Sequence, residues 1–534
     1  MAKIAEKKEA WASRIGVILA VTGSAVGLGN FLRFPGLAAE YGGGAFMIPY
    51  VVAFLLIGLP IAWVEWSLGR LGGTRGYNSA PGVFRAVCGD RRASYLAILG
   101  PLIPVMIYMY YVFVEAWCLG YAWNYLSGGL LLGNNPAEYE TFFHGFVGSQ
   151  RNGASFTGHG AQALIFLAIC FALNFFLIYR GLTKGIEWFC RWAMPALIIC
   201  ALIVLVRVLT LGTPNPDLPE QNIINGLGAM WNPTKPGQTL GQALSNPEIW
   251  LAAAGQIFFS LSVGFGIIIT YSSYMKKDDD VALSALTSAA GNGFCEVVLG
   301  GLITIPAAFV FLGISIVENP PGTFGMGFVS LPNVFNQMPA GPFFGFLFFF
   351  LLFLAAVTSS LSMLQPAIAL FEEGLGIGRK ASVAMLGFIT LIGALFVVFF
   401  SKDLTALDTI DFWVGNVCIY VMATIQVIVF GWVLGIGRGL DALGRGAEIR
   451  IPRLVGFIIK YVSPVYLIAI FILWLLHKLP DRVMALGKVE DGEPPVAALS
   501  VGLIVIVLVF FTLIINRAVS RWDRRDAAET EVSP

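Results

Sequence analysis

One stretch decides the fold of this chain: Thr22-Gly23-Ser24-Ala25-Val26-Gly27-Leu28-Gly29-Asn30-Phe31-Leu32-Arg33. It lies in an apolar segment long enough to cross a bilayer, yet it contains three glycines, an amide and an arginine. Glycine weakens a helix, and an arginine in hydrocarbon is costly. Because unwound backbone at membrane depth is tolerated only where it is packed in protein or lines a cavity, the stretch predicts a broken helix around a polar site.

The same pattern occurs a second time. Val263-Gly264-Phe265-Gly266 repeats the order Val-Gly-apolar-Gly, with Ser260 and Ser262 just before it. Two glycine-interrupted membrane segments in corresponding halves of a chain indicate the binding site of a secondary transporter. The alternative is two glycine-rich packing faces, since small residues let membrane helices approach closely. The two matches head two matching five-span blocks, which favours the binding site.

Composition indicates a membrane protein that crosses the bilayer many times. The 534 residues are 57% hydrophobic and only 12% charged, and the mean hydropathy is +0.79, which argues against a soluble domain. The net charge of +1 and the lack of a concentrated basic patch give no indication of nucleic acid binding. Seven cysteines without metal-ligand spacing predict neither a metal cluster nor a disulfide framework. No phosphate-binding loop of an ATPase is present, so primary pumping is excluded.

About twelve spans satisfy the length of ~20 apolar residues needed to cross a bilayer. They are expected at 12–38, 45–69, 93–126, 161–180, 186–210, 247–275, 282–312, 341–374, 381–400, 404–436, 451–478 and 495–517. Lys and Arg concentrate in alternate loops, which predicts that both termini are cytoplasmic in a cell membrane. The expected fold class is an all-α membrane protein.

The count of spans predicts an inverted repeat, because a block of five spans ends on the opposite side of the membrane from its start. The expected division is a cytoplasmic segment (1–11), a first repeat (12–210), an external loop (211–246), a second repeat (247–436), two further helices (451–517) and a cytoplasmic tail (518–534).

Several polar residues inside spans are candidates for ion or substrate contacts. Asn30 offers an amide oxygen to a dehydrated cation, although an interhelical hydrogen bond is the alternative. The adjacent Thr358 and Ser359 hydroxyls offer an oxygen pair for sodium, although such hydroxyls usually bond to their own helix. Asn292 and Glu296 lie four residues apart on one helical face, and a buried carboxylate indicates function. For the other membrane carboxylates, Glu65 and Glu115, structural pairing is favoured because no polar cluster is expected around them.

On these residues the chain resembles the neurotransmitter:sodium symporter family, most of all its bacterial leucine-transporting members. The resemblance spans nearly the whole length and is most specific in 23–35, 42–49, 255–274, 358–366 and 411–415. It implies two sodium sites and a substrate site between broken helices 1 and 6 of a 5+5 inverted repeat.

The resemblance implies the following ligands. Sodium site one comprises Asn30, Asn292, Ser260, the Ala25 carbonyl and the substrate carboxylate. Sodium site two comprises Thr358 and Ser359 with carbonyls of Gly23, Val26 and Ala355. The substrate pocket comprises Ser24, Ala25, Gly27, Leu28, Gly29, Ile107, Tyr111, Phe259, Ser260, Ser262, Phe265, Ser359 and Met363.

The resemblance also implies two gates: Arg33 and Asp411 above the lid formed by Phe259 and Tyr111, and Trp11, Lys8, Tyr274 and Glu373 on the inner side. Three positions depart from the family pattern. Ser260 replaces a threonine, and the inner pair Lys8 and Glu373 replaces Arg and Asp and so loses a bidentate contact. Met363 and Ile107 change the substrate pocket.

These observations predict a sodium-coupled symporter of neutral hydrophobic L-amino acids that is not an enzyme. The alternatives are a proton-coupled carrier of the same fold, a sensor that binds without transport, and a channel, which the clustering of polar groups at one depth disfavours. The resemblance implies that Glu296 supplies the charge that chloride supplies in animal relatives, so no chloride requirement is expected. Proton countertransport and a homodimer are left open.

Overall fold

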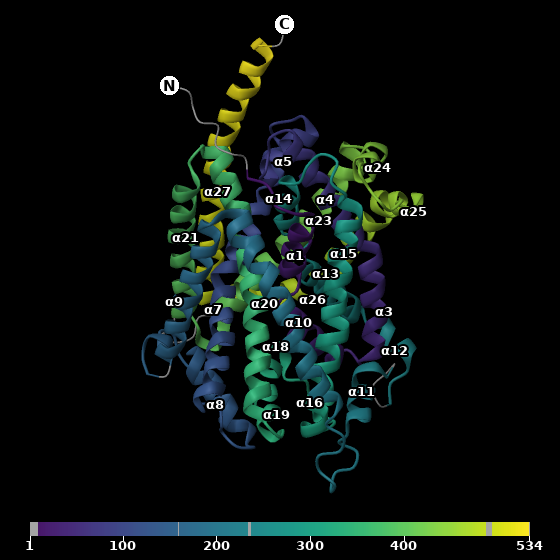
Figure 1. Cartoon of the computed structure of the whole chain (residues 1–534), viewed down its shortest axis with the longest axis vertical. Coiled ribbons are helices and arrows are strands. Elements are labelled where there is room, and N and C mark those ends of the chain that lie inside the picture. Colours follow the sequence, from purple (N-terminus) through teal and green to yellow (C-terminus); the bar gives the residue numbers. More distant parts are fainter. Residues whose placement is uncertain (1–8, 159, 233–236, 488–493, 533–534) are drawn as a thin grey trace.

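The computed structural model describes residues 9–158, 160–232, 237–487 and 494–532, and in these ranges it is a bundle of helices without strands. The long helices run side by side along the longest axis, and the two ends of the chain leave the same end of the bundle (Figure 1). An all-helical bundle of this kind satisfies its backbone polar groups internally, as a bilayer requires.

Ten helical stretches among the described residues are long and apolar enough to cross a membrane. Most are joined from shorter pieces, in which α-helix alternates with a wider π-helical turn or a tighter 3₁₀ turn. They are α3–η2–α4 (Gly44–Ala53, Phe54–Gly58, Leu59–Thr74), α6–α7 (Ala93–Leu96, Leu99–Ser127), α9 (Gly160–Tyr179), η4–α10 (Leu182–Glu187, Trp188–Leu209), α15–η5–α16 (Val281–Gly293, Phe294–Gly300, Gly301–Leu312), α20–η7 (Gly341–Leu370, Phe371–Leu375), α21 (Arg379–Phe399), η8–α22–η9–α23–η10 (Lys402–Leu404, Thr405–Ile410, Asp411–Cys418, Ile419–Ile428, Val429–Val433), α25–η11–α26 (Arg453–Phe457, Ile458–Val462, Ser463–Leu486) and α27 (Val496–Val532).

Two of the twelve predicted spans are not continuous helices. The first is a bent pair, α1 (Arg14–Ala25) and η1–α2 (Gly29–Arg33, Phe34–Glu40), with 48° between its halves, and counting this pair as one span gives eleven. The span expected at 247–275 consists of α13 (Pro247–Leu261) and α14 (Ile267–Ser273). These have 15 and 7 residues, each less than the ~20 residues of a full crossing.

Short helices connect the long ones. They are α5 (Ala80–Cys88), α8 (Pro136–Val147), η3 (Ala154–Phe156), α11 (Ile223–Trp231), α12 (Leu240–Ser245), α17 (Ser315–Glu318), α18 (Gly322–Gly325), η6 (Met326–Ser330), α19 (Leu331–Gln337) and α24 (Ile436–Gly444).

The first break, residues 26–28, follows from its glycines and from one amide side chain. Val26 is extended (φ −75°, ψ 98°) and ends α1. The Asn30 side chain then accepts a hydrogen bond from the Gly27 amide at 2.8 Å. This caps a backbone donor that a helix end would leave without a partner.

The second break, residues 262–266, is wider and needs left-handed backbone. Ser262, Gly264 and Gly266 have φ of 52°, 80° and 77°, a region that glycine adopts freely and other residues rarely. A Cβ on Gly266 would lie 2.6 Å from the Gly100 Cα atom, so glycine is also required by close packing on α7.

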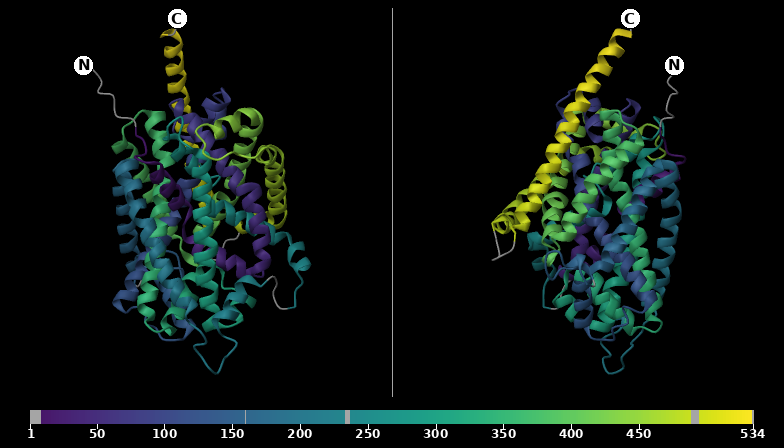
Figure 2. Two further views of the ribbon diagram at one scale, coloured as in Figure 1. Left: turned by 45° about the vertical axis from the view of Figure 1, so that its right-hand side comes forward. Right: turned by 90° about the vertical axis from the view of Figure 1, so that its left-hand side faces the viewer.

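The broken helices lie inside the bundle. α1 packs on α15, α20 and α10, and α14 packs on α4. α27 crosses the outside of the bundle obliquely (Figure 2). Outer helices expose large apolar side chains such as Phe388, Val465 and Ile506, as expected of surfaces that face lipid. The division into two five-helix repeats and the membrane orientation stay predictions.

Candidate substrate and sodium sites

A cavity lies between the two breaks. Its lining residues come from α1, η1, α7, α13, α20 and both breaks: Ser24, Ala25, Gly27, Leu28, Gly29, Asn30, Ile107, Tyr111, Phe259, Ser260, Ser262, Phe265, Ser359 and Met363. All thirteen residues predicted to contact substrate are among these fourteen, and Asn30 is the fourteenth. None of the described residues in this lining carries a charge.

One side of the cavity is polar. A Cβ on Gly27 would lie 3.1 Å from both the Tyr111 hydroxyl and the Ser359 hydroxyl, so these two oxygens face the unwound backbone. Ser262 donates to the Ser24 carbonyl at 3.0 Å, and the hydroxyl of Ser24 is 2.7 Å from that of Ser362. Hydroxyls of this kind suit a carboxylate, and the positive end of a half-helix favours an anion.

The other side is apolar. The rings of Phe259 and Phe265 are 5.8 Å apart, edge to face, and Ile107 and Met363 complete the wall. A pocket that is mostly apolar with a few convergent polar groups is typical of small-molecule sites.

The residues expected at sodium site one form a continuous chain of hydrogen bonds. Asn30 donates to the side-chain oxygen of Asn292 at 2.8 Å, and Asn292 donates to the Ser260 hydroxyl at 2.5 Å. Ala25 is buried and lines the same cavity. The amide and hydroxyl oxygens are neutral hard ligands, which suit an alkali cation.

Glu296 continues this chain. Its carboxylate accepts from Ser260 and Tyr50, both at 2.5 Å, and from Gln256. The sequence places Asn292 and Glu296 on one face, and in the structure both contact Ser260. Three donated hydrogen bonds match the acceptor capacity of an ionised carboxylate, so a negative charge at Glu296 is accommodated next to the predicted ion site.

At the predicted second sodium site, two hydroxyls lie against backbone carbonyls. Thr358 donates to the Ala355 carbonyl at 3.0 Å. The Ser359 hydroxyl lies 3.0, 3.2 and 3.4 Å from the carbonyl oxygens of Ala355, Ser24 and Gly23, and its one proton can be donated to any of them. α1 and α20 therefore meet through oxygen atoms. Val26 is fully buried beside them, and its amide donates to the Thr22 carbonyl.

The outer gate residues are brought together around Phe259, but they do not pair with each other. The Arg33 guanidinium lies 4.2 Å from the centre of the Phe259 ring. Asp411 accepts from the Tyr110 hydroxyl at 2.6 Å, a contact that the sequence did not indicate. A Cβ on Gly415 would lie 2.7 Å from the Asp411 carboxylate and 2.8 Å from the Phe259 ring, so Asp411 and Phe259 lie against the same glycine.

At the inner side the predicted residues separate into two groups. Trp11 donates to the Tyr271 carbonyl at 2.8 Å, and the Tyr274 hydroxyl accepts from Gln365 at 3.1 Å. Glu373 accepts from the Asn78 amide at 2.6 Å and from Ser79. Lys8 lies outside the described residues, so its pairing with Glu373 stays a prediction.

Sequence reasoning missed an inner ion pair. Arg379 contacts Glu9 at 2.9 Å and Glu372 at 3.7 Å, and it donates to Gln365 at 2.9 Å. The loop charge of Arg379 was visible in the sequence, but its partner is 370 residues away and no local pattern links the two.

The structural pairing predicted for Glu65 and Glu115 is confirmed, but the expectation that no polar groups surround them is wrong. Glu115 accepts from Asn174 at 3.0 Å and from Ser360 at 2.5 Å. Glu65 accepts from Gln426 at 2.7 Å and from the backbone amide of Gly264 at 3.2 Å. The partners come from other helices, which is why the neighbouring sequence looked apolar.

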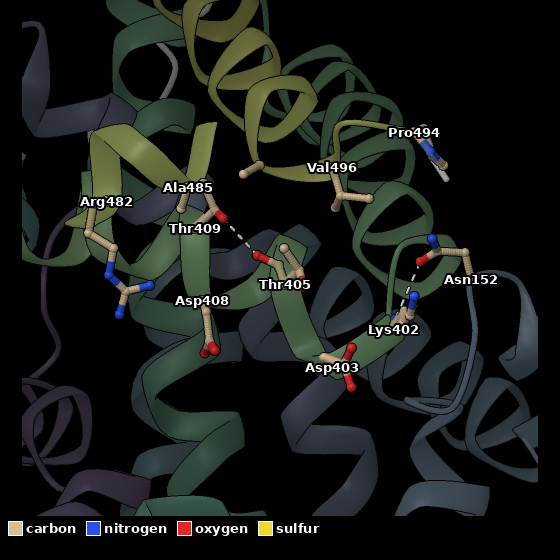
Figure 3. Close-up of a pocket in the computed structure, with 11 residues that line it drawn as sticks. Asn152, Lys402, Asp403, Thr405, Asp408, Thr409, Arg482, Ala485, Pro494 and Val496 are labelled. Atoms are coloured by element: carbon tan, nitrogen blue, oxygen red, sulfur yellow. Dashed lines mark hydrogen bonds between the residues drawn. The ribbon is translucent and has the colours of Figure 1, made fainter. Parts of the chain in front are cut away.

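A separate pocket of about 270 Å³ lies between α22, the end of α26 and the start of α27. Its side chains carry both charges: Lys402 and Asp403 lie near Asn152, and Arg482 lies on the side of Asp408 (Figure 3). None of the predicted site residues lines it, so it is distinct from the cavity at the breaks.

The fold and the cavity define the class: a polytopic membrane transporter with a site built around broken helices. The model of the sodium:neurotransmitter symporter family matches residues 8–141 and 134–517, and the chain belongs to this family. It is a sodium-dependent transporter, not an enzyme.

Individual relatives agree with this assignment. The chain is 28% identical over 472 residues to an uncharacterized sodium-dependent transporter of Methanocaldococcus jannaschii, a match that covers 88% of this chain and 90% of that protein. It is 32% identical over 372 residues to the uncharacterized sodium-dependent transporter YhdH of Bacillus subtilis, covering 69% and 74%. The crystal structure of MhsT in complex with L-phenylalanine superimposes with a TM-score of 0.73 at 29% identity, covering 87% of this chain and 99% of MhsT.

Proposed function

We propose that this protein is a sodium-coupled symporter of neutral, hydrophobic L-amino acids that works by alternating access around the cavity at the breaks. The observation that carries the proposal is that cavity, in which uncharged polar groups face an apolar wall. The solved structure of MhsT with L-phenylalanine supports the same substrate class. We also propose that residues 12–210 and 247–436 form the two five-helix repeats.

The α-carboxylate of the substrate would lie against the amides of Leu28 and Gly29 and the Tyr111 hydroxyl, and would complete the shell of sodium one. Gly27 leaves no carboxylate in the cavity that could pair with an amine-only ligand. Because sodium and substrate then share ligands, each binds better when the other is present, and this reciprocal coupling drives uptake. Since the cavity measures only about 50 Å³, substrate binding would require it to widen, and the Phe259 ring with Arg33 above it is the part that we expect to move.

A competition screen tests the substrate class. Purified protein in sodium is incubated with one labelled hydrophobic amino acid and with each of the twenty amino acids. Aliphatic and aromatic amino acids should compete, and Asp, Glu, Lys and decarboxylated amines should not. Displacement by tyramine as strong as by tyrosine would contradict the proposal. Replacing sodium with choline separates the sodium-coupled carrier from the proton-coupled alternative, and counterflow in proteoliposomes separates a carrier from a sensor.

The charge of Glu296 affects which ions transport requires. Two sodium ions and a zwitterion leave the site positively charged, and a nearby carboxylate offsets that charge. Glu296 accepts three hydrogen bonds and is linked to Asn292 through Ser260. We therefore expect transport without chloride, and proton release from Glu296 as sodium enters would give outward proton movement.

Uptake after replacing chloride with gluconate tests this role. Wild-type uptake should persist, whereas Glu296→Ser should require chloride and lose proton countermovement. Glu115→Gln is the matched control, because it removes another buried carboxylate that lies outside the cavity lining, and it should stay independent of chloride. A serine variant that ignores chloride would refute the role of Glu296.

A further inference from the structure

A second pocket, of about 240 Å³, lies at the end of the bundle from which both termini emerge. Three segments far apart in sequence form it: the end of α4, the loop after α14, and α24. These elements are neighbours at that end in Figure 1. None of the predicted site residues lines this pocket.

The pocket is strongly basic. It is lined by Arg70, Arg75, Lys277, Arg438 and Arg445, with Asp441 as its single acidic residue. Within the described ranges none of these six side chains takes part in an ion pair. Five cations against one carboxylate leave a concentrated positive charge.

Arg70 is the buried part of this charge. Its side chain is almost fully buried, and its guanidinium donates to backbone carbonyls only, those of Arg445 at 2.9 Å and of Asp279 and Ala442. Asp278, Asp279 and Asp280 lie near Arg70, and none of them forms an ion pair with it. Asp279 accepts from the Lys276 amide, and Asp280 pairs with Arg14 at 3.1 Å. Because no carboxylate among the described residues pairs directly with this buried guanidinium, an anion in the pocket would be stabilised.

The pocket lies beside an exposed apolar surface. Leu434 lines it, and the preceding Trp432 and Val433 are 56% and 50% exposed. Trp432 donates to the Lys460 carbonyl at 3.0 Å, and the Lys460 ammonium lies 5.0 Å from the Trp432 ring centre. Exposed tryptophan next to basic residues is typical of the membrane–water interface.

We propose that this pocket binds the phosphate of an acidic phospholipid headgroup, with the acyl chains lying along Trp432 and Val433. Basic pockets between membrane helices recognise such headgroups. The apolar surface at the mouth favours a lipid over free phosphate, because free phosphate gains nothing from that surface. A bound lipid would tie α24 to the end of α4 and to the loop after α14.

Native mass spectrometry of the full-length protein in neutral detergent tests the proposal, with phosphatidylglycerol and phosphatidylcholine as the two probes. Wild type should retain phosphatidylglycerol preferentially. Lys277→Gln/Arg438→Gln/Arg445→Gln should weaken its retention on the order of 100-fold, since each basic residue near an anionic headgroup contributes a factor of about five.

The matched control is Lys276→Gln/Arg450→Gln/Arg453→Gln, which removes the same charge from exposed neighbours outside the pocket. Its lipid retention should stay within about twofold of wild type. An equal loss in the control would overturn the proposal in favour of diffuse surface charge. Inorganic phosphate that displaces phosphatidylglycerol at equal concentration would overturn the assignment to a lipid. All substituted side chains are exposed, so unchanged melting temperatures verify folding.

Discussion

The two helix breaks share a sequence pattern and differ in geometry. The first spans residues 26–28, bends the chain by 48°, and keeps negative φ at Gly27 and Gly29. The second spans residues 262–266 and has three residues with positive φ. The same Val-Gly-apolar-Gly order therefore gives a break without left-handed backbone in one half of the chain and a break with three left-handed residues in the other.

The breaks also differ in what holds them. The first is held by Asn30 and Ser359, which line the cavity. At the second break Ser262 donates to the Ser24 carbonyl inside the cavity, but Gly264 is held by Glu65, which accepts from the Gly264 amide and from Gln426 and lies outside the cavity lining. The Asn30 and Ser359 contacts lie where a ligand could replace them, whereas the Glu65 contacts join the second break to α4 and α23. This predicts that the first break changes conformation when ions bind, whereas the second keeps its conformation and holds the surrounding helices in place.

The sharpest test of this difference is Gly266→Ala. A Cβ would lie 2.6 and 2.7 Å from backbone atoms of Gly100, and φ is 77°. Left-handed backbone at a non-glycine residue costs about 1–3 kcal/mol, and forced packing costs about as much again. We expect little folded protein by size-exclusion chromatography and a large drop in melting temperature. A variant that melts within a few degrees of wild type would contradict the prediction that the second break is fixed in its conformation.

The next test removes the oxygens that face the first break. Thr358→Ala with Ser359→Ala should reduce sodium-dependent uptake to background while the protein stays folded, because both hydroxyls of the predicted second sodium site are lost. Thr424→Ala with Ser500→Ala is the control, since both hydroxyls bond only to their own helix, and it should transport normally. Sodium-dependent uptake that survives in the first variant would exclude this site.

A paired comparison follows with smaller effects. Glu65→Gln should destabilise the protein by about 1–3 kcal/mol, because a buried acceptor of two hydrogen bonds is weakened, and it should leave sodium affinity unchanged. Asn30→Ala should weaken sodium and substrate together, because they share ligands. Thermal melts measure the change in stability, and sodium titrations of substrate binding measure the change in affinity. If Asn30→Ala kept the full sodium dependence of substrate affinity, the proposal that sodium and substrate share ligands would be wrong.

The sequence placed the cavity lining correctly but missed most contacts between distant helices. The thirteen residues predicted to contact substrate, and Asn30, line one cavity. They could be picked out because glycine and polar residues stand out inside apolar spans and because the family pattern assigned them to one site. Their roles toward substrate and sodium stay predictions. The contacts of Glu65 with Gln426, Tyr110 with Asp411, and Arg379 with Glu9 join residues that are 301 to 370 positions apart in the sequence. Such pairs have no periodicity or spacing, so they emerge only once the helices are packed.

The smallest expected effect is that of Gly29→Ala, which completes the comparison with Gly266→Ala. Gly29 has negative φ, and the nearest atom to a Cβ built there is the Gln256 amide nitrogen at 3.8 Å, an ordinary contact. Alanine also loses less backbone entropy than glycine on folding, which stabilises by about 0.4–1 kcal/mol where the conformation is compatible. The backbone amide expected to bind the substrate carboxylate remains. We therefore expect a melting temperature at or slightly above that of wild type, with substrate affinity within about threefold, less than 1 kcal/mol. Loss of folding in this variant would show that the two breaks depend on their glycines for the same reason, and would remove the distinction between a ligand-responsive break and an anchored one.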